Sequence, residues 1–220
     1  MKLWSDSFRP GEFIPGEYAF GIMDPASHVA LSANKNPHLA WSEVPAGTKS
    51  LALICHDPDV PSRGDDVNQE GKSVPANLPR VDFFHWVMVD LPAATTRIDV
   101  AQFSNGVTTR GKPGPEVKDH PGVRHGLNDY TGWFAGDANM GGDYCGYDGP
   151  CPPWNDTLVH RYVFTLYALD IERLPVEGKF TGQQVRDAIK GHVLAEASVM
   201  GRYTLNPALI GSTDNSIWPA

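Results

Sequence analysis

The sequence lacks a basic block and a long apolar run, and each shortage excludes a class of protein. Its 220 residues carry 18 Lys and Arg against 26 Asp and Glu, a net charge of −8. This balance argues against a nucleic-acid-binding surface or a surface for anionic membranes. No apolar run approaches the roughly 18 residues that suggest a spanning helix. The first residues, MKLWSDSF, turn polar at once, without the apolar core of a secretory signal. We therefore expect a cytoplasmic protein without a transmembrane segment.

Cysteine is also scarce, and its count is odd. The three cysteines are Cys55, Cys145 and Cys151. Cys55 lies in an apolar run and is most simply a small core residue. Cys145 and Cys151 are too far apart for the short C-x-x-C spacing of a zinc site. We expect free thiols, with a local disulfide between Cys145 and Cys151 as the alternative.

Proline and glycine, in contrast, are plentiful and divide the chain into short segments. The 19 prolines and 22 glycines are too many for a helical bundle, while the 41% hydrophobic content is enough for a core. Several segments rich in β-branched and aromatic residues are predicted to be strands. They cover residues Tyr18–Ile22, Leu39–Trp41, Leu51–His56, Phe83–Asp90 and Tyr162–Asp170. The sequence predicts one mainly β domain spanning residues 1–220.

One convincing helix is expected near the C-terminus. Thr181 and Gln184 have the spacing of a capping box, and an apolar stripe follows at Val185, Ala188, Ile189 and Val193. Gly191 should weaken this helix, so we expect two short helices or one bent helix. Helices at one end of an antiparallel sheet system indicate a small helical appendage to a β-rich domain.

Two stretches are predicted to be long loops. Residues Arg63–Val81 are polar, and residues Lys112–Pro153 are rich in glycine and proline. Loops of this length in a compact domain are usually functional rims or disordered segments. Neither resembles a linker between two cores, and no internal repeat is visible.

Ionisable residues interrupt the predicted strands at three places. Asp57 and Asp59 bracket Pro58 at the end of an apolar strand, His85 and Trp86 lie inside another strand, and His160-Arg161-Tyr162 begins a third. Taken singly, a histidine in a strand is usually a satisfied core residue, and Asp-Pro is usually a turn. Three such groups could also converge on one pocket.

Several chemistries would fit such a pocket. His85, His160 and a carboxylate have the composition of a non-haem iron site, although the usual H-x-H or H-x-D spacing is absent. Hydrolysis would need a nucleophile such as Ser62 or Cys55, but no G-x-S-x-G motif is present. Residues 137–148 loosely imitate a calcium-binding loop, with ligand positions missing.

The ordered set of motifs resembles one family. DPDVPS, HWVMVDLP and GPCPP followed by HRYVFTLYALD are similar, in this order, to the phosphatidylethanolamine-binding protein family. NPHLAWSEVPAGTKSLAL and GHVLAEASVMGRYTL resemble its bacterial and archaeal branch, the Raf kinase inhibitor-like proteins. The chain departs from compact members in Val60, where a small alanine is frequent, and in its longer loops at Arg63–Val81 and Asp119–Asp148.

The resemblance implies two packed antiparallel β-sheets with short C-terminal helices, and a small anion pocket at one end of the strands. It implies binding of phosphate-type anions or phospholipid headgroups without catalysis, cofactor or metal. A regulatory or kinase-inhibitor-like role, a phosphorylated protein partner and a homodimer are further implications. The implied pocket residues are Asp57, Asp59, His85, Trp86, Pro152, Pro153, His160 and Tyr162.

A simple mechanism accounts for carboxylates in an anion site. Pro58 has a fixed φ, so the aspartates on either side of it lie on a stiff corner. A carboxylate that accepts from one imidazole nitrogen of His85 or His160 favours the charged ring and leaves the other nitrogen to donate to a phosphate oxygen. Tyr162 adds a neutral hydroxyl donor. The Val60-Pro61 bond could be cis or trans.

Overall fold

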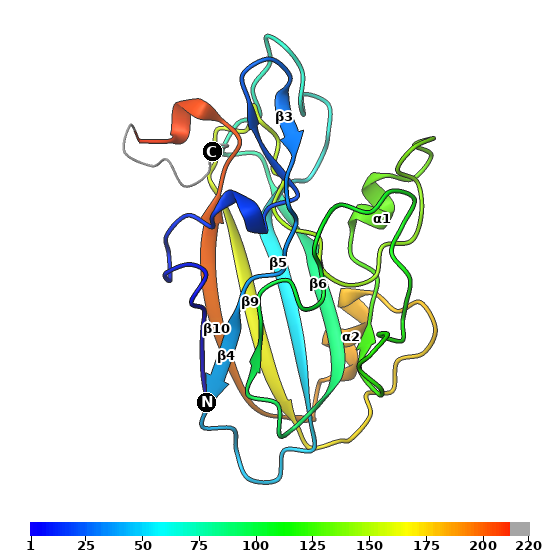
Figure 1. The fold of residues 1–220 in the computed structure, drawn as a ribbon. Coiled ribbons are helices and arrows are strands. Elements are labelled where there is room, and N and C mark those ends of the chain that lie inside the picture. The colour runs from blue at the N-terminus through cyan, green and yellow to red at the C-terminus, as the bar shows by residue number, and fades with distance from the viewer. Residues whose placement is uncertain (212–220) are drawn as a thin grey trace.

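Antiparallel strands make up most of the regular structure. The computed structural model describes residues 1–211 of the chain. A five-stranded sheet has the order β10-β9-β5-β6-β8, and a three-stranded sheet has the order β1-β4-β7 (Figure 1). The five strands are β10 (Val193–Tyr203), β9 (His160–Leu169), β5 (Ser50–Pro61), β6 (Arg80–Pro92) and β8 (Arg124–His125). The other three are β1 (Lys2–Trp4), β4 (Leu39–Ser42) and β7 (Arg97–Ile98).

The remaining elements are short. A separate hairpin pairs β2 (Gly21–Asp24) with β3 (His28–Leu31). The helices are α1 (Tyr130–Trp133) and α2 (Gly182–Ala188), with 3₁₀ turns at η1 (Gly16–Tyr18) and η2 (Pro207–Leu209). None of the helices described is long and apolar enough to cross a membrane. The expected mainly β fold with packed antiparallel sheets is confirmed.

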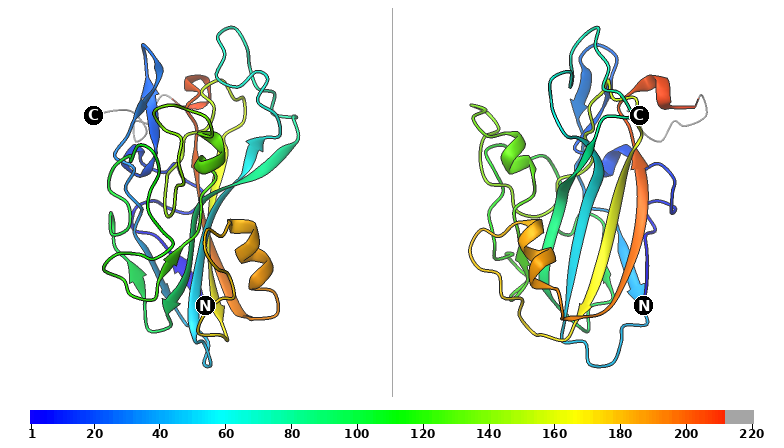
Figure 2. Two further views of the ribbon diagram at one scale, coloured as in Figure 1. Left: turned by 90° about the vertical axis from the view of Figure 1, so that its right-hand side faces the viewer. Right: turned by 180° about the vertical axis from the view of Figure 1, so that it is seen from behind.

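The central strand β5 is buried on both faces because it separates two apolar clusters. Leu51, Leu53 and Cys55 face the larger core, which also contains Trp41 of the three-stranded sheet. Ala52 and Ile54 face a second cluster that includes residues of α2. The view from the side places α2 on the outer face of the large sheet (Figure 2). A strand covered on both faces has a nearly continuous apolar run, as residues 51–55 do.

The C-terminal region is partly different from the expectation. Thr181 forms the expected capping box with Gln184, and α2 starts directly after it. The helix ends at Ala188, and Gly191 has a φ of +83°, a value that glycine tolerates without strain. The chain then continues as β10, so the prediction that Val193 belongs to the helical stripe was wrong. β10 pairs antiparallel with β9.

Other predicted boundaries also shifted. The expected strand Tyr18–Ile22 is a 3₁₀ turn followed by β2, whereas β5 extends past the predicted end to Pro61. The Val60–Pro61 bond is trans, because Gly114–Pro115 is the one cis bond in the described part of the chain. All three cysteines are free thiols, as expected.

Candidate functional site

A cavity of about 420 Å³ opens where the long strands end, and we call it the strand-end cavity. Asp57 of β5, His85 of β6, and His160 and Tyr162 of β9 contribute its polar groups. Its walls come from β3, α1 and the segment 62–79 between β5 and β6, which we call the insert. Figures 1 and 2 show the β2–β3 hairpin and the insert protruding from the same end of the sheets.

Strand alternation places Asp57 at the cavity, and an irregularity removes Asp59 from it. Successive residues of a strand face opposite sides, so Asp57 follows Cys55 on the inner face. Asp57 pairs with Phe83 and Val60 with Val81, so β5 contains one residue more than β6 over this stretch. Such a bulge re-aims the side chains that follow it.

Asp59 consequently binds Arg161 outside the cavity. The Arg161 Nε and Nη2 atoms donate to its carboxylate over 2.8 and 2.7 Å. Burial acts to raise the pKa of Asp59, but the bonds from Arg161 outweigh it and hold the pKa below its ordinary value. Because Arg161 lies between the inward-facing His160 and Tyr162, this ion pair is on the opposite side of the sheet.

A second bulge places His85 in the cavity. Cys55 pairs with Trp86 and the next residue, His56, pairs with Phe84, so His85 is the extra residue of β6. Trp86 lies in the core between the sheets and Phe84 in the cluster against α2. His85 and Trp86 are therefore both on the inner side, which strict alternation would not allow.

His160 lies at the centre of a buried chain of charges. Its Nδ1 is 2.6 Å from Asp57 Oδ2, and its Nε2 is 3.0 Å from Asp156 Oδ2. Asp156 also accepts from Arg80 over 2.5 and 3.1 Å. His160, Asp57 and Asp156 are almost completely buried. The order Asp57–His160–Asp156–Arg80 alternates negative and positive groups.

The neighbouring carboxylates keep the His160 ring protonated but occupy both of its nitrogens. Burial acts to lower the pKa of His160, but the two carboxylates together raise it to about 9. The expected charged imidazole is present, whereas the expected free nitrogen for a phosphate is not, because Asp156 takes it. Sequence reasoning missed Asp156, since an Asn-Asp pair in a loop has the pattern of an ordinary turn.

Tyr162 carries a buried cavity hydroxyl that has no partner among the described residues. Its side chain is 1% exposed, and its hydroxyl forms no hydrogen bond with any residue of the described range 1–211. Burial, and next the negative charge of Asp57, raise the pKa of Tyr162, so the hydroxyl stays protonated. A buried hydroxyl without a partner costs about 1–3 kcal/mol relative to a satisfied one. It is a donor available to a bound molecule.

His85 offers the cavity its second nitrogen. The Nδ1 atom lies 2.8 Å from the backbone oxygen of Asp148. A carbonyl oxygen only accepts, so Nδ1 carries a proton and fixes the tautomer. Burial lowers the pKa of His85, so the ring is neutral at pH 7 and its Nε2 is an acceptor. An anion beside this ring would favour its protonated form.

Six of the eight residues predicted for the pocket therefore lie together. Asp57, His85, Pro152, Pro153, His160 and Tyr162 line the strand-end cavity. Asp59 and Trp86 do not line it. The Trp86 side chain is fully buried in the core, and its Nε1 donates to His125 Nε2 over 3.3 Å.

The insert is an ordered wall of the strand-end cavity. The buried Asn155 side chain donates to the backbone oxygens of Asp66, Gln69 and Lys72 over 2.8, 3.3 and 3.2 Å. Its Oδ1 accepts from the Asn68 backbone N–H over 3.0 Å. These bonds fix the loop from a single side chain. The next residue, Asp156, binds His160, so two adjacent residues hold the insert and the buried polar groups of the cavity.

The other walls are apolar and partly exposed. Val29 and Leu31 of β3, with Trp133 and Phe134 at the end of α1, line the cavity. Leu31 and Trp133 are more than half exposed, at 61% and 58%. A polar floor below apolar walls is typical of small-molecule sites. The arrangement suits a ligand with a polar head and an apolar substituent.

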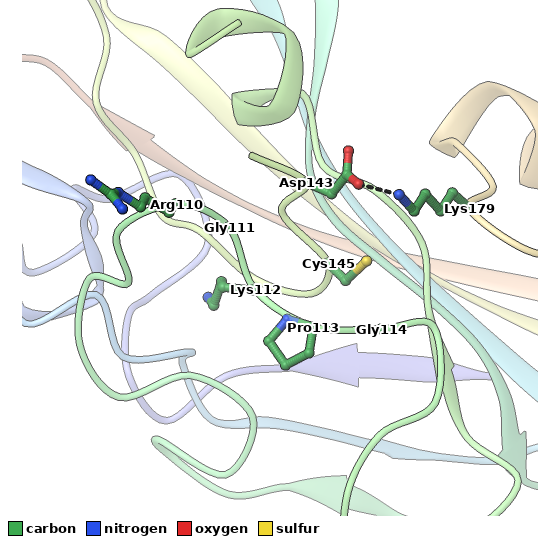
Figure 3. Close-up of a pocket in the computed structure, with 8 residues that line it drawn as sticks. All are labelled: Arg110, Gly111, Lys112, Pro113, Gly114, Asp143, Cys145 and Lys179. Atoms are coloured by element: carbon green, nitrogen blue, oxygen red, sulfur yellow. Dashed lines mark hydrogen bonds and ion pairs between the residues drawn. The ribbon is translucent and has the colours of Figure 1, made fainter. Parts of the chain in front are cut away.

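A second cavity of about 300 Å³ lies among the loops 110–114 and 143–145 and beside Lys179, and we call it the loop cavity. Lys179 pairs with Asp143 across its rim (Figure 3). Lys112 turns its ammonium group to Asp148, 3.2 Å away, and to the backbone oxygen of Tyr147. Burial raises the pKa of Cys145 to about 11. Both lysines of the loop cavity are thus engaged within the protein.

Comparisons with known proteins show which family this chain resembles. The family model described as phosphatidylethanolamine-binding protein matches residues 4–204. The UPF0098 protein YbhB of Escherichia coli is 33% identical over 93% of this chain and 100% of its own. A UPF0098 protein of Aquifex aeolicus is 30% identical over 92% of this chain and 88% of its own.

Solved structures show the same relationship. The structure of E. coli YbcL, described as a new member of the mammalian PEBP family, has a TM-score of 0.63 and 26% identity. It is matched over 92% of this chain and 97% of its own. A putative phosphatidylethanolamine-binding protein homologue from Chlamydia trachomatis gives a TM-score of 0.57 at 28% identity, over 92% of this chain and 95% of its own.

Proposed function

The chain belongs to the phosphatidylethanolamine-binding protein family, and from this premise we propose that the strand-end cavity binds the phosphate of a phosphate ester or a phospholipid headgroup. The observation that carries this proposal is the buried Tyr162 hydroxyl, which has no partner in residues 1–211. A ligand oxygen that accepts from it would satisfy a donor that folding has removed from water.

The remaining polar groups fit the same role. His85 turns an unpaired Nε2 to the ligand and, as the pH falls below about 6.5, takes up a proton together with a bound anion. His160 does not touch the ligand but acts as a positioning residue, because it holds the Asp57 carboxylate in place. Asp57 can accept from a ligand group that carries a proton, such as the ammonium of an ethanolamine headgroup.

We propose binding without turnover. Burial raises the pKa of Cys151, the cysteine that lines the cavity, to about 12, so its thiol is protonated and a poor nucleophile. Incubation with methyl phenyl phosphate, followed by NMR for released phenol or methanol, checks this.

A regulatory role, a phosphorylated protein partner, a homodimer and a cytoplasmic location remain predictions that rest on the resemblance and the sequence.

The substitution Tyr162→Phe tests the proposal. It removes the unpaired hydroxyl, so the affinity for methyl phenyl phosphate should fall by about 0.5–1.5 kcal/mol in calorimetry, while the free energy of unfolding should stay unchanged or rise. Tyr203→Phe is the matched control, since its buried hydroxyl donates to the Gly21 oxygen over 2.9 Å. This control should lose stability and keep its affinity. Unchanged affinity in Tyr162→Phe would contradict the role of the hydroxyl.

A further inference from the structure

A permanent positive charge lies at the mouth of the strand-end cavity. Arg63, near the start of the insert, is the one Lys or Arg among the described residues that line this cavity. Its side chain is 70% exposed. An arginine is always charged at physiological pH and can bind a phosphate through two parallel N–H donors.

The interior of the site supplies no net positive charge. Two carboxylates, Asp57 and Asp156, alternate with the two cations His160 and Arg80. These four groups therefore cancel. The whole chain has a net charge of −8, so its long-range field repels anions. An anionic ligand therefore needs a positive charge that these four buried groups do not provide.

The neighbouring cations are bound within the protein. Arg161 forms two bonds with the carboxylate of Asp59 outside the cavity. Arg80 donates to Asp156 and to the backbone oxygens of Pro75, Leu78 and Asp59. Neither can turn to a ligand without leaving a buried carboxylate unpaired, which would cost several kcal/mol. Arg63 has no such commitment.

The one ion pair of Arg63 is weak. Its Nε lies 3.5 Å from Oδ2 of Asp65, and both side chains are mostly exposed, at 70% and 75%. Exposed pairs of this kind contribute little, since water and salt screen them. The backbone beside Arg63 is nevertheless held, because the Ser62 N–H donates to the Pro79 oxygen over 3.0 Å. The Arg63 guanidinium can therefore leave Asp65 and bind a ligand while its backbone stays in place.

On the basis of the proposed function, we propose that Arg63 is the residue that makes the strand-end cavity select anionic ligands over neutral ones. The preferred class is a phosphate ester whose charged oxygens reach Arg63 and Tyr162 and whose apolar substituent lies against the walls formed by Leu31 and Trp133. The insert, which sequence analysis identified as a departure from compact relatives, thereby has a role in specificity.

Two probes that differ by one methyl group and one charge test this selection. Methyl phenyl phosphate is a monoanion near neutral pH, and dimethyl phenyl phosphate has the same aromatic group without charge. In calorimetry at low salt, Arg63→Gln should weaken binding of the diester by about three- to tenfold and leave binding of the triester unchanged. Arg97→Gln is the matched control, because Arg97 pairs with Asp99 at the same sequence spacing and is 66% exposed.

A reciprocal variant changes affinity in the opposite direction. Asp65→Asn removes the competing carboxylate, so the diester should bind about two- to threefold more tightly, whereas Asp99→Asn should have no effect. If wild-type protein and Arg63→Gln bind the diester with equal affinity, the assignment of Arg63 is wrong and the proposed function still stands. Wild-type protein that binds neither probe would overturn the proposed function, and the assignment of Arg63 with it.

Discussion

The strand-end cavity and the loop cavity contain the same kinds of charged groups but hold them in different surroundings. In the strand-end cavity, the His160 side chain is 0% exposed and lies between two carboxylates. In the loop cavity, the Lys179 side chain is 66% exposed and pairs with the half-exposed Asp143. Water screens the second pair and not the first.

This difference shows which groups serve the fold and which can serve a ligand. The buried charges at the strand end satisfy one another, and the hydroxyl of Tyr162 remains without a partner in the described structure. In the loop cavity, Lys112 and Lys179 are both engaged, and burial holds the Cys145 thiol protonated. Among the described residues, a buried polar group without a partner, rather than the number of charges, distinguishes the strand-end cavity from the loop cavity.

The largest expected effect is on stability at the strand end. His160→Gln removes the cation between Asp57 and Asp156 and should lower the free energy of unfolding by about 3–5 kcal/mol. Lys179→Met, at the rim of the loop cavity, should lower it only slightly, because water screens this exposed pair. Urea denaturation of both variants measures the difference. Similar losses would show that burial does not separate the two cavities.

The pH dependence of stability gives a control on the same residue. The pKa of His160 rises from 6.5 to about 9 on folding, so the folded state binds more protons between these values. Its contribution to stability is complete below pH 6.5 and is lost as the pH rises to about 9. Wild-type protein should lose stability relative to His160→Gln across this window. A constant difference between the two would contradict the buried imidazolium.

A smaller effect is expected in the wall of the strand-end cavity. Asn155→Ala removes the hydrogen bonds that fix the insert and should lower the free energy of unfolding by about 2 kcal/mol. Gln69→Ala lies in the same insert and removes one exposed bond to the Asp65 oxygen, so it should change little. Urea denaturation and limited proteolysis of the insert check both. Equal proteolysis rates would show that Asn155 does not hold the wall.

The main strands and most of the polar floor could be predicted from the sequence because they follow simple patterns. The apolar run 51–55 identified a strand buried on both faces, and an aspartate two residues past its last inward residue had to face the same side. By the same alternation, Tyr162 faces the same side as His160, which lies two residues before it. The resemblance to a family then indicated which of these residues share a pocket.

The bulges were not predictable, because an extra residue in a strand leaves no mark on the order of apolar and polar residues. Two of the three register irregularities between β5 and β6 fall in the site, where one admits His85 and the other removes Asp59. Loop residues were missed for a related reason. Asn155 and Asp156 have the composition of a turn, and their roles depend on segments some 80 residues away.

β10 was missed because its apolar residues fit two periods. Val193 continues the helical spacing of Val185 and Ile189, although it also begins the alternating pattern of a strand. Gly191 decides between the two, since its φ of +83° ends the helical course of the chain. The prediction treated Gly191 as a residue that weakens or bends a helix, whereas in the structure the helix has ended before it.

The smallest expected effect concerns ligand affinity and pH, and it distinguishes His85 from His160. Burial lowers the folded-state pKa of His85 below 6.5, and an anion beside its Nε2 favours the protonated ring. The affinity for methyl phenyl phosphate should therefore be nearly constant between pH 7 and 8 and rise as the pH falls below about 6.5. One proton taken up limits this rise to about tenfold per pH unit. Because the diester keeps its single charge over this range, its own ionisation does not contribute. Calorimetry of wild-type protein and His85→Gln measures the trend, which the variant should lack. An affinity that instead falls between pH 8 and 10 in both proteins would identify His160, whose pKa is about 9, as the group linked to binding.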